Sequence, residues 1–458
     1  MSVIILRGDA AHLPLPDASV DLICTSPPFW GLRDYQDGGE SLNGQIGSEP
    51  TPGEYIANLL ACTREWMRVL KPEGSIFCNL GDAYSKRADA GAGRTYRADS
   101  ADALQPSRNT TGFAPRKSLL GLPWRYALGC VDDLGLILRA EILWSKANGM
   151  PESMVDRVRR SHEQVFHFTK QPRYFAAVDE IRQAHKPQSV ARGSRRYAAG
   201  DLLSVGTPNT LDPHQFCNPL GALPGSVWEI PSQPLSVPAH LGVDHWAAFP
   251  MELPRRIILG WSPSGVCTGC GEGRRPVVDA TRIGGGRLWE SSGRGVVDRL
   301  PRTHDERTSR HFQGYACRCT PYTDHPERRG KDFHAASDRS RQGMNDGNGG
   351  ERYRRYVEEL ANPRGPVREY DFDAWSPAPT RPAVIVDPFG GTGTTALVAD
   401  TLGRTGITID RSMDYARIAQ WRTADPAERA RALGVPKPPP VMDRQGSLFD
   451  SAEAGEAS

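Results

Sequence analysis

Short apolar runs alternate with helical segments along this chain, and each run ends in a turn of small or acidic residues. Residues 54–70 carry apolar side chains at three-to-four spacing, which predicts an amphipathic helix that stops at Pro72 and Gly74. The runs around this helix are residues 3–6, ending at Gly8-Asp9, residues 20–24, ending at Thr25-Ser26-Pro27-Pro28, and residues 75–80, ending at Gly81-Asp82. This alternation predicts a parallel α/β sheet with its functional site at the carboxyl ends of the strands.

Further runs extend the predicted sheet toward the C-terminus. They are residues 134–144, 164–169, 384–386 and 407–409, with another helix from about Ala396. Long polar stretches separate them, and 47 glycines with 38 prolines among 458 residues are more than a compact domain uses. We therefore predict one folded core that carries long loops or insertions.

Composition excludes several classes of protein. The 56 basic and 54 acidic residues leave a formal net charge of +2, which excludes a highly basic chromatin-type protein but not a local face for nucleic acid. No apolar run approaches the ~20 residues of a membrane span, and Arg7 follows Met1 too closely for a signal peptide. Five of the nine cysteines are scattered singly, which is typical of a reduced compartment. These features predict a soluble cytoplasmic protein.

A glycine-rich turn, Asp387-Pro-Phe-Gly-Gly-Thr-Gly-Thr-Thr, joins the strand at 384–386 to the next helix. Such a turn lets a ligand approach backbone N–H groups and the helix N-terminus. It differs from the P-loop of nucleotide hydrolases because Gly393 is followed by Thr394 where a P-loop has lysine. Asp410 ends the following strand about 20 residues later, where a carboxylate can bind ribose hydroxyls. The pair favours a cofactor that contains a nucleoside.

A second motif, Ser26-Pro27-Pro28-Phe29, directly follows the strand at 20–24. Two consecutive prolines hold the backbone rigid and present carbonyl oxygens without N–H donors. With the Ser26 hydroxyl they form a cluster of acceptors beside an aromatic ring. This arrangement is suited to hold an exocyclic amino group and to stack on its ring, although a proline-stiffened strand exit with Phe29 in the core would have the same sequence.

Together the two motifs resemble those of the DNA amino-methyltransferases. The turn from Asp387 resembles their S-adenosylmethionine motif, Ser26-Pro27-Pro28-Phe29 resembles their catalytic motif, and the catalytic motif stands first, as in the β-class permutation of the family. Other similar segments are Gly8-Asp9, Leu70-Lys-Pro-Glu-Gly-Ser-Ile-Phe, Trp144-Ser-Lys-Ala-Asn and His245-Trp-Ala-Ala-Phe249-Pro250. The resemblance implies an α/β, Rossmann-like, S-adenosylmethionine-dependent methyltransferase fold with seven strands, circularly permuted, with inserted recognition and zinc-binding segments.

The resemblance also implies roles for individual residues. Ser26 and the Pro27 carbonyl would accept the two N–H bonds of the amino group, with Pro28 in the same catalytic motif and Phe29 stacked on a base flipped out of the duplex. The methyl transfer would be direct, so that no cysteine serves as a nucleophile. The implied cofactor-binding residues are Asp387, Phe389, Gly391, Gly393 and Thr394 in the turn, Asp410 at the ribose, Asp9 beside the adenine and Phe249 on the opposite wall.

The target base and the partners are inferred in the same way. Within the family, Ser-Pro-Pro-Tyr/Phe goes mostly with N4 of cytosine and Asp-Pro-Pro-Tyr with N6 of adenine, so Ser26 implies cytosine N4 in double-stranded DNA. The alternatives are an adenine-N6 enzyme, a catalytically silent DNA-binding factor, and an enzyme that methylates RNA or protein. The resemblance implies a protein of a bacterium or a phage that acts in the bacterial cytoplasm. It also implies a cognate restriction endonuclease as a possible partner, and a monomer or a homodimer as the oligomeric state.

Four cysteines form a separate candidate site. Cys267-Thr-Gly-Cys270-Gly is typical of a zinc knuckle, and Cys317-Arg-Cys319 would complete a tetrahedral set of thiolates. Two spacings in the sequence differ from those of a compact zinc ribbon. Only one residue separates the cysteines of the second pair, and the stretch of sequence between the two pairs is longer. Free thiols are the alternative, and His304, His311 and His325 are substitute ligands. We predict a structural zinc that holds the surrounding insertion together.

The domain organisation follows from these motifs. Predicted parts are a catalytic half at 1–182 with a mobile loop at 83–117, a target-recognition segment at 183–225 that contains Arg192, Arg195 and Arg196, a cofactor-pocket wall at 226–266, an Arg/Gly-rich insertion with the zinc site at 267–380, a cofactor-binding half at 381–425, and a disordered tail at 426–458. The insertion either contacts DNA through its arginines or is a solvated surface appendage.

Overall fold

The computed structural model describes residues 3–32, 35–85, 113–149, 152, 154–188, 221–242, 249–282, 308–325 and 367–435. The chain divides into two compact units. The first unit comprises Met1–Ala184, Leu220–Ser264 and Pro382–Ser458, and the second comprises His185–Pro219 and Gly265–Arg381. Segments from both ends of the chain therefore fold together in the first unit.

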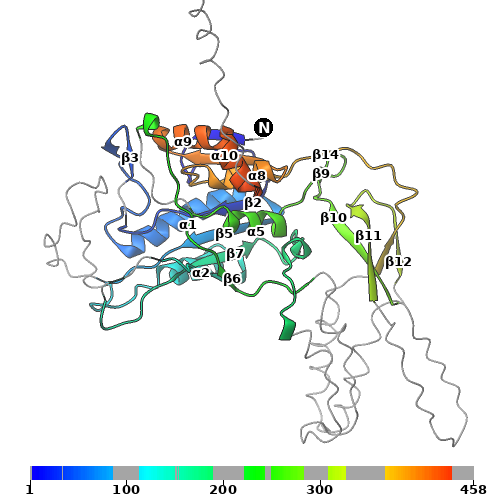
Figure 1. The fold of residues 1–458 in the computed structure, drawn as a ribbon, viewed down its shortest axis with the longest axis horizontal. Coiled ribbons are helices and arrows are strands. Elements are labelled where there is room, and N and C mark those ends of the chain that lie inside the picture. Colours follow the sequence, from blue (N-terminus) through cyan, green and yellow to red (C-terminus); the bar gives the residue numbers. More distant parts are fainter. Residues whose placement is uncertain are drawn as a thin grey trace, which may run out of the picture. The chain divides into compact units, whose positions relative to one another are not determined.

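An eight-stranded sheet forms the centre of the first unit, in the order β1-β16-β15-β2-β5-β7-β6-β8 (Figure 1). Its strands are β1 (Val3–Arg7), β2 (Val20–Thr25), β5 (Leu70–Leu80), β6 (Ile137–Ser145), β7 (His162–Thr169), β8 (Val227–Glu229), β15 (Val384–Asp387) and β16 (Thr405–Asp410). The strands from β1 to β5 in this order are parallel, whereas β7 is antiparallel to β5 and β6. Because β15 and β16 lie between β1 and β2, the two ends of the chain build one half of the sheet together.

The predicted Rossmann-like α/β fold is confirmed, and every predicted strand is present in the central sheet. Two details of the prediction are wrong. The sheet has eight strands because β8 pairs with the end of β6 and buries Trp228, and three residues are too few to show a strand period in sequence. The sheet is also not wholly parallel, because β6 and β7 form an antiparallel pair at one side of it.

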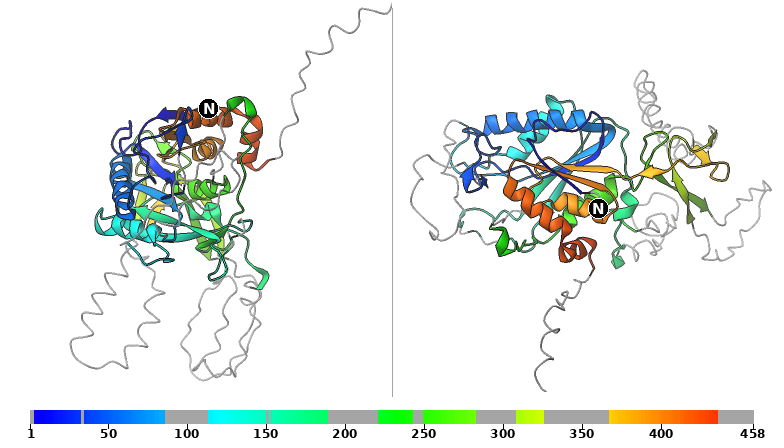
Figure 2. Two further views of the ribbon diagram at one scale, coloured as in Figure 1. Left: turned by 90° about the vertical axis from the view of Figure 1, so that its left-hand side faces the viewer. Right: turned by 90° about the horizontal axis from the view of Figure 1, so that it is seen from above.

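Helices cover both faces of the sheet (Figure 2, right). The helices α1 (Pro52–Val69) and α2 (Leu122–Asp132) lie on one face, and α5 (Glu252–Trp261), α8 (Thr394–Thr401) and α9 (Met413–Ala424) lie on the other. The short elements of this unit are the 3₁₀ turns η1 (Val178–Ile181) and η2 (Ala239–Leu241) and the hairpin of β3 (Gln36–Asp37) and β4 (Glu40–Ser41). Within the described residues no helix is both long and apolar enough to cross a membrane.

Helix α1 confirms the helix predicted at 54–70, but it begins two residues earlier and ends at Val69. Thr51 Oγ1 accepts a hydrogen bond of 3.2 Å from the backbone N–H of Glu54, and Pro52 occupies the first turn, where a missing N–H costs nothing. Trp66 is fully buried between this helix and the sheet. Its Nε1 donates to the carbonyl of Ala10 at 3.0 Å, which ties the helix to the loop that follows β1.

The prediction of a disordered tail from residue 426 is wrong for its first part, which is the helix α10 (Pro426–Leu433). The Asp425 carboxylate accepts hydrogen bonds of 2.9 Å from the N–H groups of Ala427 and Glu428 and so caps this helix. The buried Glu428 carboxylate in turn binds Arg422 of α9 at 2.8 Å. These contacts order a segment whose composition suggested disorder, and residues 436–458 lie outside the described residues.

The second unit consists, in its described part, of antiparallel strand pairs. The strand β9 (Val266–Cys267) pairs with β14 (Thr380–Arg381), β10 (Arg275–Arg282) with β11 (Thr308–Ala316), and β12 (Tyr322–His325) with β13 (Val367–Tyr370). The Arg/Gly-rich insertion predicted at 267–380 therefore contains regular structure. The first of these pairs brings the two ends of the insertion together.

Candidate active site at the carboxyl ends of the central strands

A cavity of about 520 Å³ lies in the first unit where β1, β2, β15 and β16 end. This volume is within the range of roughly 300–1,000 Å³ that ligand sites occupy. The predicted site residues that line the cavity are Asp9, Ser26, Pro27, Pro28, Phe29, Phe249, Phe389, Gly391, Thr394 and Asp410. The two sequence motifs, more than 350 residues apart, thus share one cavity.

Asp387 and Gly393 are predicted cofactor-binding residues that do not line the cavity. Asp387 is 1% exposed, and its carboxylate accepts hydrogen bonds from the Thr25 hydroxyl at 2.7 Å, the Thr395 hydroxyl at 2.8 Å and the Phe389 N–H at 3.1 Å. Burial raises the pKa of Asp387 to about 6, although these bonds favour the carboxylate. Asp387 therefore stabilises the conformation of the glycine-rich turn through buried hydrogen bonds. Its neighbours in the turn, such as Phe389 and Gly391, are the residues that line the cavity.

Gly393 has a structural role at the start of α8. It is the N-cap residue with φ +74°, a conformation that favours glycine, and a Cβ there would lie 2.9 Å from the Cβ of Ala419. The next residue, Thr394, does line the cavity, and its hydroxyl accepts a hydrogen bond of 2.6 Å from the buried guanidinium of Arg422. Glycine at this turn lets α8 and α9 pack closely beside the cavity.

Asp410 lines the cavity beside the glycine-rich turn. Its two carboxylate oxygens each accept a backbone hydrogen bond of 2.9 Å, one from Gly391 and one from Ser412. Burial raises the pKa of Asp410, and the two backbone N–H groups oppose that shift. Each carboxylate oxygen has a second lone pair, so Asp410 can also accept a hydrogen bond from a ligand hydroxyl.

The loop after β2, which also lines the cavity, is held in place by a hydrogen bond and by close packing. The Tyr55 hydroxyl donates to the Pro28 carbonyl at 2.9 Å, and a Cβ at Gly81 would lie 2.5 Å from the ring of Phe29. The Phe29 ring therefore occupies a position that only glycine at 81 permits. Among the described residues no hydrogen bond engages the Pro27 carbonyl, which leaves this oxygen available as an acceptor.

Three further polar residues in the same cavity have no counterpart in the predicted site. Asn79 at the end of β5 donates through Nδ2 to Ser26 Oγ at 3.2 Å and to Glu163 Oε2 at 2.7 Å. Glu163 on β7 forms an ion pair with Lys146, which follows β6. Asn79 lies on β5, Glu163 on β7 and Lys146 directly after β6, and the antiparallel pairing of β7 with both other strands brings them together, so no spacing in the sequence predicts the cluster.

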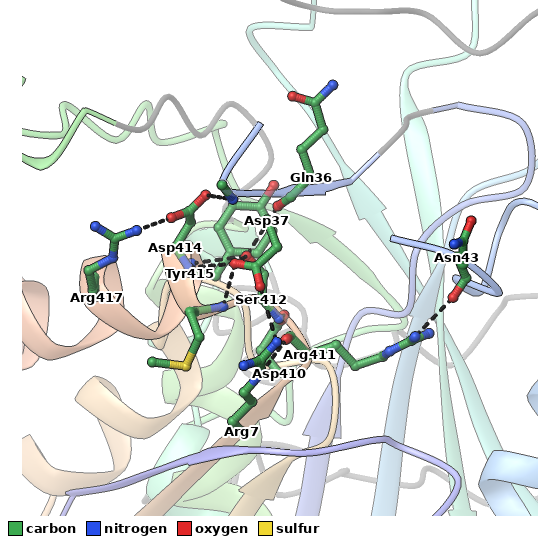
Figure 3. A network of polar contacts seen from close by, with 12 residues as sticks. Arg7, Gln36, Asp37, Asn43, Asp410, Arg411, Ser412, Asp414, Tyr415 and Arg417 are labelled. Atoms are coloured by element: carbon green, nitrogen blue, oxygen red, sulfur yellow. Dashed lines mark hydrogen bonds and ion pairs between the residues drawn. The ribbon is translucent and has the colours of Figure 1, made fainter. Parts of the chain in front are cut away.

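Residues that flank the hairpin β3–β4, Tyr35 and Leu42 among them, line the cavity, and the hairpin itself docks on the start of α9 (Figure 3). Asp37 Oδ1 accepts a hydrogen bond of 2.8 Å from the N–H of Met413, and its Oδ2 pairs with Arg7 at 3.2 Å. Arg411 donates to the Asn43 carbonyl at 2.9 Å, and the ring of Tyr35 meets that of Tyr415 edge-on with centroids 6.1 Å apart. No pattern in the sequence predicts this hairpin, because its strands are only two residues long.

The cysteine nearest the cavity is unsuited to nucleophilic chemistry. Cys62 lines the cavity from α1, and burial raises the pKa of its thiol to about 12. Burial likewise raises the pKa of Cys24 and Cys78 well above the ordinary value. These thiols stay protonated near neutral pH and pack as small apolar groups.

The predicted zinc ligands come together in the second unit. The four Sγ atoms of Cys267, Cys270, Cys317 and Cys319 all lie within 4.8 Å of one another. Gly271, at φ +75°, donates its N–H to the Cys267 carbonyl at 2.9 Å and closes the first knuckle. The residue set and its spacing fit a tetrahedral zinc site with four thiolates.

Several predicted features lie wholly or partly outside the described residues. These are His304, Arg192, Arg195 and Arg196, most of the predicted recognition segment at 183–225, and residues 86–112 of the predicted mobile loop. Phe249 does line the cavity, but the segment 243–248 before it is not described. The backbones of His311 and His325 belong to β11 and β12.

Solved structures resemble this chain only in broad outline. The PvuII DNA methyltransferase (cytosine-N4-specific) aligns with 95% of this chain and 91% of its own, at 14% identity and a TM-score of 0.44. A putative DNA modification methylase from Thermus thermophilus, complexed with S-adenosyl-L-methionine, aligns with 94% of this chain at a TM-score of 0.38.

Sequence relatives are closer. The type II methyltransferase M.SmaI of Serratia marcescens is 31% identical over 272 residues, which cover 57% of this chain and 76% of the relative. M.XycI of Xanthomonas campestris pv. cyanopsidis is 41% identical over 180 residues, 37% of this chain and 55% of the relative. M.Cfr9I of Citrobacter freundii is 38% identical over 188 residues, 39% of this chain and 58% of the relative. The chain thus spans little more than half the length of the last two.

A family model described as DNA methylase, for N6 and N4 methyltransferases, matches residues 20–267 and 380–421. The match covers more than half of the chain and contains both Ser26-Pro27-Pro28-Phe29 and the glycine-rich turn from Asp387. With the mixed, mostly parallel sheet and the shared cavity, this match establishes that the chain belongs to the DNA methylase family.

Proposed function

We propose that this protein transfers a methyl group from S-adenosylmethionine to the exocyclic N4 of cytosine in double-stranded DNA. One observation carries the proposal: the Ser26 hydroxyl and the Pro27 carbonyl line the same cavity as the glycine-rich turn and Asp410. An amino group held by the first pair would face a cofactor held by the second. Membership of the DNA methylase family and the type II methyltransferases among the relatives support the same conclusion.

The donor set at the cofactor end fits S-adenosylmethionine. The Asp410 carboxylate can accept hydrogen bonds from ribose hydroxyls, and Asp9 and Phe249, which line the same cavity, would flank the adenine. Gly391 lets the ligand approach the backbone, and Phe389 adds an apolar wall. S-adenosylmethionine supplies an electrophilic methyl group when it is bound. The acidic side chains also favour a ligand that carries positive charge on sulfur.

The chain's own residues make the amino nitrogen a better nucleophile. This nitrogen is conjugated with the base ring and is therefore poorly nucleophilic. By accepting its two N–H bonds, Ser26 Oγ and the Pro27 carbonyl oxygen would draw it toward a tetrahedral geometry, with the lone pair directed at the cofactor. Phe29 would hold the flipped base by stacking. As the new N–C bond forms, the bond between the methyl carbon and sulfur would break and leave a neutral thioether, and the nitrogen would then release a proton to solvent.

Cytosine is favoured over adenine because the motif begins with serine. The two amines need nearly the same chemistry, so the proposal is tested at the level of the product. We would express the chain in a methylation-free bacterial host, digest the host DNA to nucleosides and separate them. N4-methylcytosine is the expected product. N6-methyladenine alone would overturn the choice of base, and no modified base would favour a catalytically silent factor.

We also propose a structural zinc bound by Cys267, Cys270, Cys317 and Cys319. Close approach of the four Sγ atoms supports it, as does the ion pair of 2.8 Å between Glu272 and Arg318, which joins the two knuckles. Zinc would stabilise this unit by replacing a buried apolar core with metal–thiolate bonds. Four thiolates fill a tetrahedral shell and leave no position for a substrate, which makes the proposed role structural.

The relatives' description as type II methyltransferases supports a place in restriction and modification. We propose that the protein acts in the bacterial cytoplasm, alongside a restriction endonuclease that cleaves the same unmethylated sequence. Digestion of host DNA by such a nuclease, before and after expression of this chain, tests the pairing. Protection at one recognition sequence is expected, whereas unchanged cleavage by nucleases of every specificity tried would contradict it.

A further inference from the structure

The cluster of Asn79, Glu163 and Lys146 lies at the base end of the cavity and is not used by the transfer mechanism above. We infer that Lys146 selects cytosine by donating a hydrogen bond to the carbonyl oxygen of the flipped base. The inference rests on the proposed function and deepens it, because it names the residue that distinguishes the two amino-bearing bases.

Hydrogen bonding fixes the orientation of the cluster. The two protons on Asn79 Nδ2 go to Ser26 Oγ at 3.2 Å and to Glu163 Oε2 at 2.7 Å. A flipped Asn79 amide would place its oxygen against the Glu163 carboxylate, which is unfavourable. Asn79 Oδ1 is buried and has no partner among the described residues, so the bonds through Nδ2 outweigh the loss of one acceptor. Glu163 thus sets the position of Asn79, and Asn79 sets the position of Ser26.

This arrangement leaves Ser26 with defined hydrogen-bonding capacity. A serine hydroxyl has two lone pairs and one proton. One lone pair accepts from Asn79, so the second is available for an N–H of the target amino group. The hydroxyl proton is then available for the ring nitrogen next to the amino-bearing carbon. Cytosine and adenine both have an acceptor nitrogen there, so Ser26 alone does not distinguish them.

The next ring position does distinguish them. Cytosine has a carbonyl oxygen on the carbon beyond that nitrogen, where adenine has a C–H. Lys146 lines the cavity with 27% of its side chain exposed, and Nζ lies 4.5 Å from the centroid of the Trp144 ring. One of its three protons serves the ion pair with Glu163, which leaves donors for a ligand in the cavity. A donor directed at this position binds the cytosine carbonyl and finds no acceptor on adenine.

The test compares Lys146→Met with the wild-type protein on two duplexes. The first duplex carries the sequence that the wild type methylates, identified by sequencing host DNA, and the second has adenine in place of the target cytosine. Loss of a charge-assisted hydrogen bond should lower the rate on cytosine about tenfold or more and leave the rate on adenine unchanged. Lys146→Arg keeps a cationic donor and should restore part of the preference. Lys117→Met is the matched control, because Lys117 pairs with Asp156 on the surface and does not line the cavity.

Three other outcomes would contradict the inference, and the rates on the two duplexes distinguish them. Equal losses on both duplexes would mean that Lys146 only holds Glu163 and Asn79 in place. Unchanged rates on both would mean that it has no part in selection. A wild-type protein that methylates adenine alone, or neither base, would overturn the proposed function itself, and this result is visible before any variant is made.

Discussion

The Thr25 hydroxyl donates a hydrogen bond of 2.7 Å to Asp387 Oδ1, across 362 positions of sequence. Thr25 is the last residue of β2, directly before the Ser-Pro-Pro-Phe motif, and Asp387 is the first residue of the glycine-rich turn. The bond is buried and lies below the cavity. It therefore holds the proposed catalytic loop and the proposed cofactor turn in one fixed relationship.

Removing this bond should destabilise the first unit. In Thr25→Val a methyl group replaces the hydroxyl, so Oδ1 of the buried Asp387 carboxylate loses the shorter of its two hydrogen bonds and keeps the one from the Phe389 N–H. We expect the free energy of unfolding to fall by about 1–3 kcal/mol, measured by denaturant titration. Thr405→Val on β16 removes a half-buried hydroxyl that makes no bond to Asp387 and should change stability much less. Equal effects of the two substitutions would contradict the role given to Thr25.

Asp387 should also make stability depend on pH. Its pKa is about 6 in the folded protein and near 3.8 when unfolded, so between these values the folded state binds more protons. The contribution of Asp387 is therefore complete below about pH 4 and is lost as pH rises through about 6, by up to about 3 kcal/mol. Asp387→Asn removes this titration. The difference in unfolding free energy between wild type and variant should change over this interval and be constant above it, and a flat difference throughout would refute the prediction.

Ser26→Ala should slow methylation and leave cofactor binding near normal. The substitution removes the acceptor for one N–H of the target amino group without touching the cofactor end of the cavity. We expect single-turnover rates to fall about tenfold or more, while calorimetry with S-adenosylmethionine gives an unchanged affinity. Ser19→Ala, which removes a hydroxyl bound to the Pro16 carbonyl, is the control. Unchanged turnover in Ser26→Ala would remove this residue from the mechanism.

Asp410→Asn should have the opposite profile and weaken cofactor binding. The substitution removes the negative charge that would accept the ribose hydroxyls, and we expect about a tenfold loss of affinity in calorimetry. Asp132→Asn on the exposed end of α2 should leave the affinity unchanged. A normal affinity in Asp410→Asn would show that this carboxylate only orders the turn through Gly391 and Ser412.

Metal analysis of the purified protein should find about one zinc per chain. Cys270→Ser should lower the zinc content and the unfolding temperature, because one of the four thiolates is lost. Cys62→Ala, in helix α1 of the first unit, should keep its zinc. Zinc-free protein from carefully prepared samples would leave the four cysteines as free thiols.

The cavity illustrates how far motif residues can be predicted from sequence. Ser26 and Asp410 were predicted because each stands at the carboxyl end of a recognisable strand, and both line the cavity. Asp387 belongs to the same motif but is buried beneath the cavity, because its carboxylate is drawn to Thr25 and Thr395. Position in a motif predicts that a residue is needed at the turn. It does not predict which side of the turn its side chain occupies.

The sequence by itself determined the α/β class, the strands that carry the two motifs, the amphipathic helix near 54–70 and the grouping of four cysteines by spacing, because all of these depend on local periodicity and turn chemistry. Tertiary structure decided what depends on contacts between distant segments. The antiparallel strand β7 placed Glu163 beside Asn79, and Asp425 with Glu428 ordered α10 against Arg422. Hydrogen bonds of this kind join residues from different strands and helices, so the side chains that meet are settled only when the sheet is assembled.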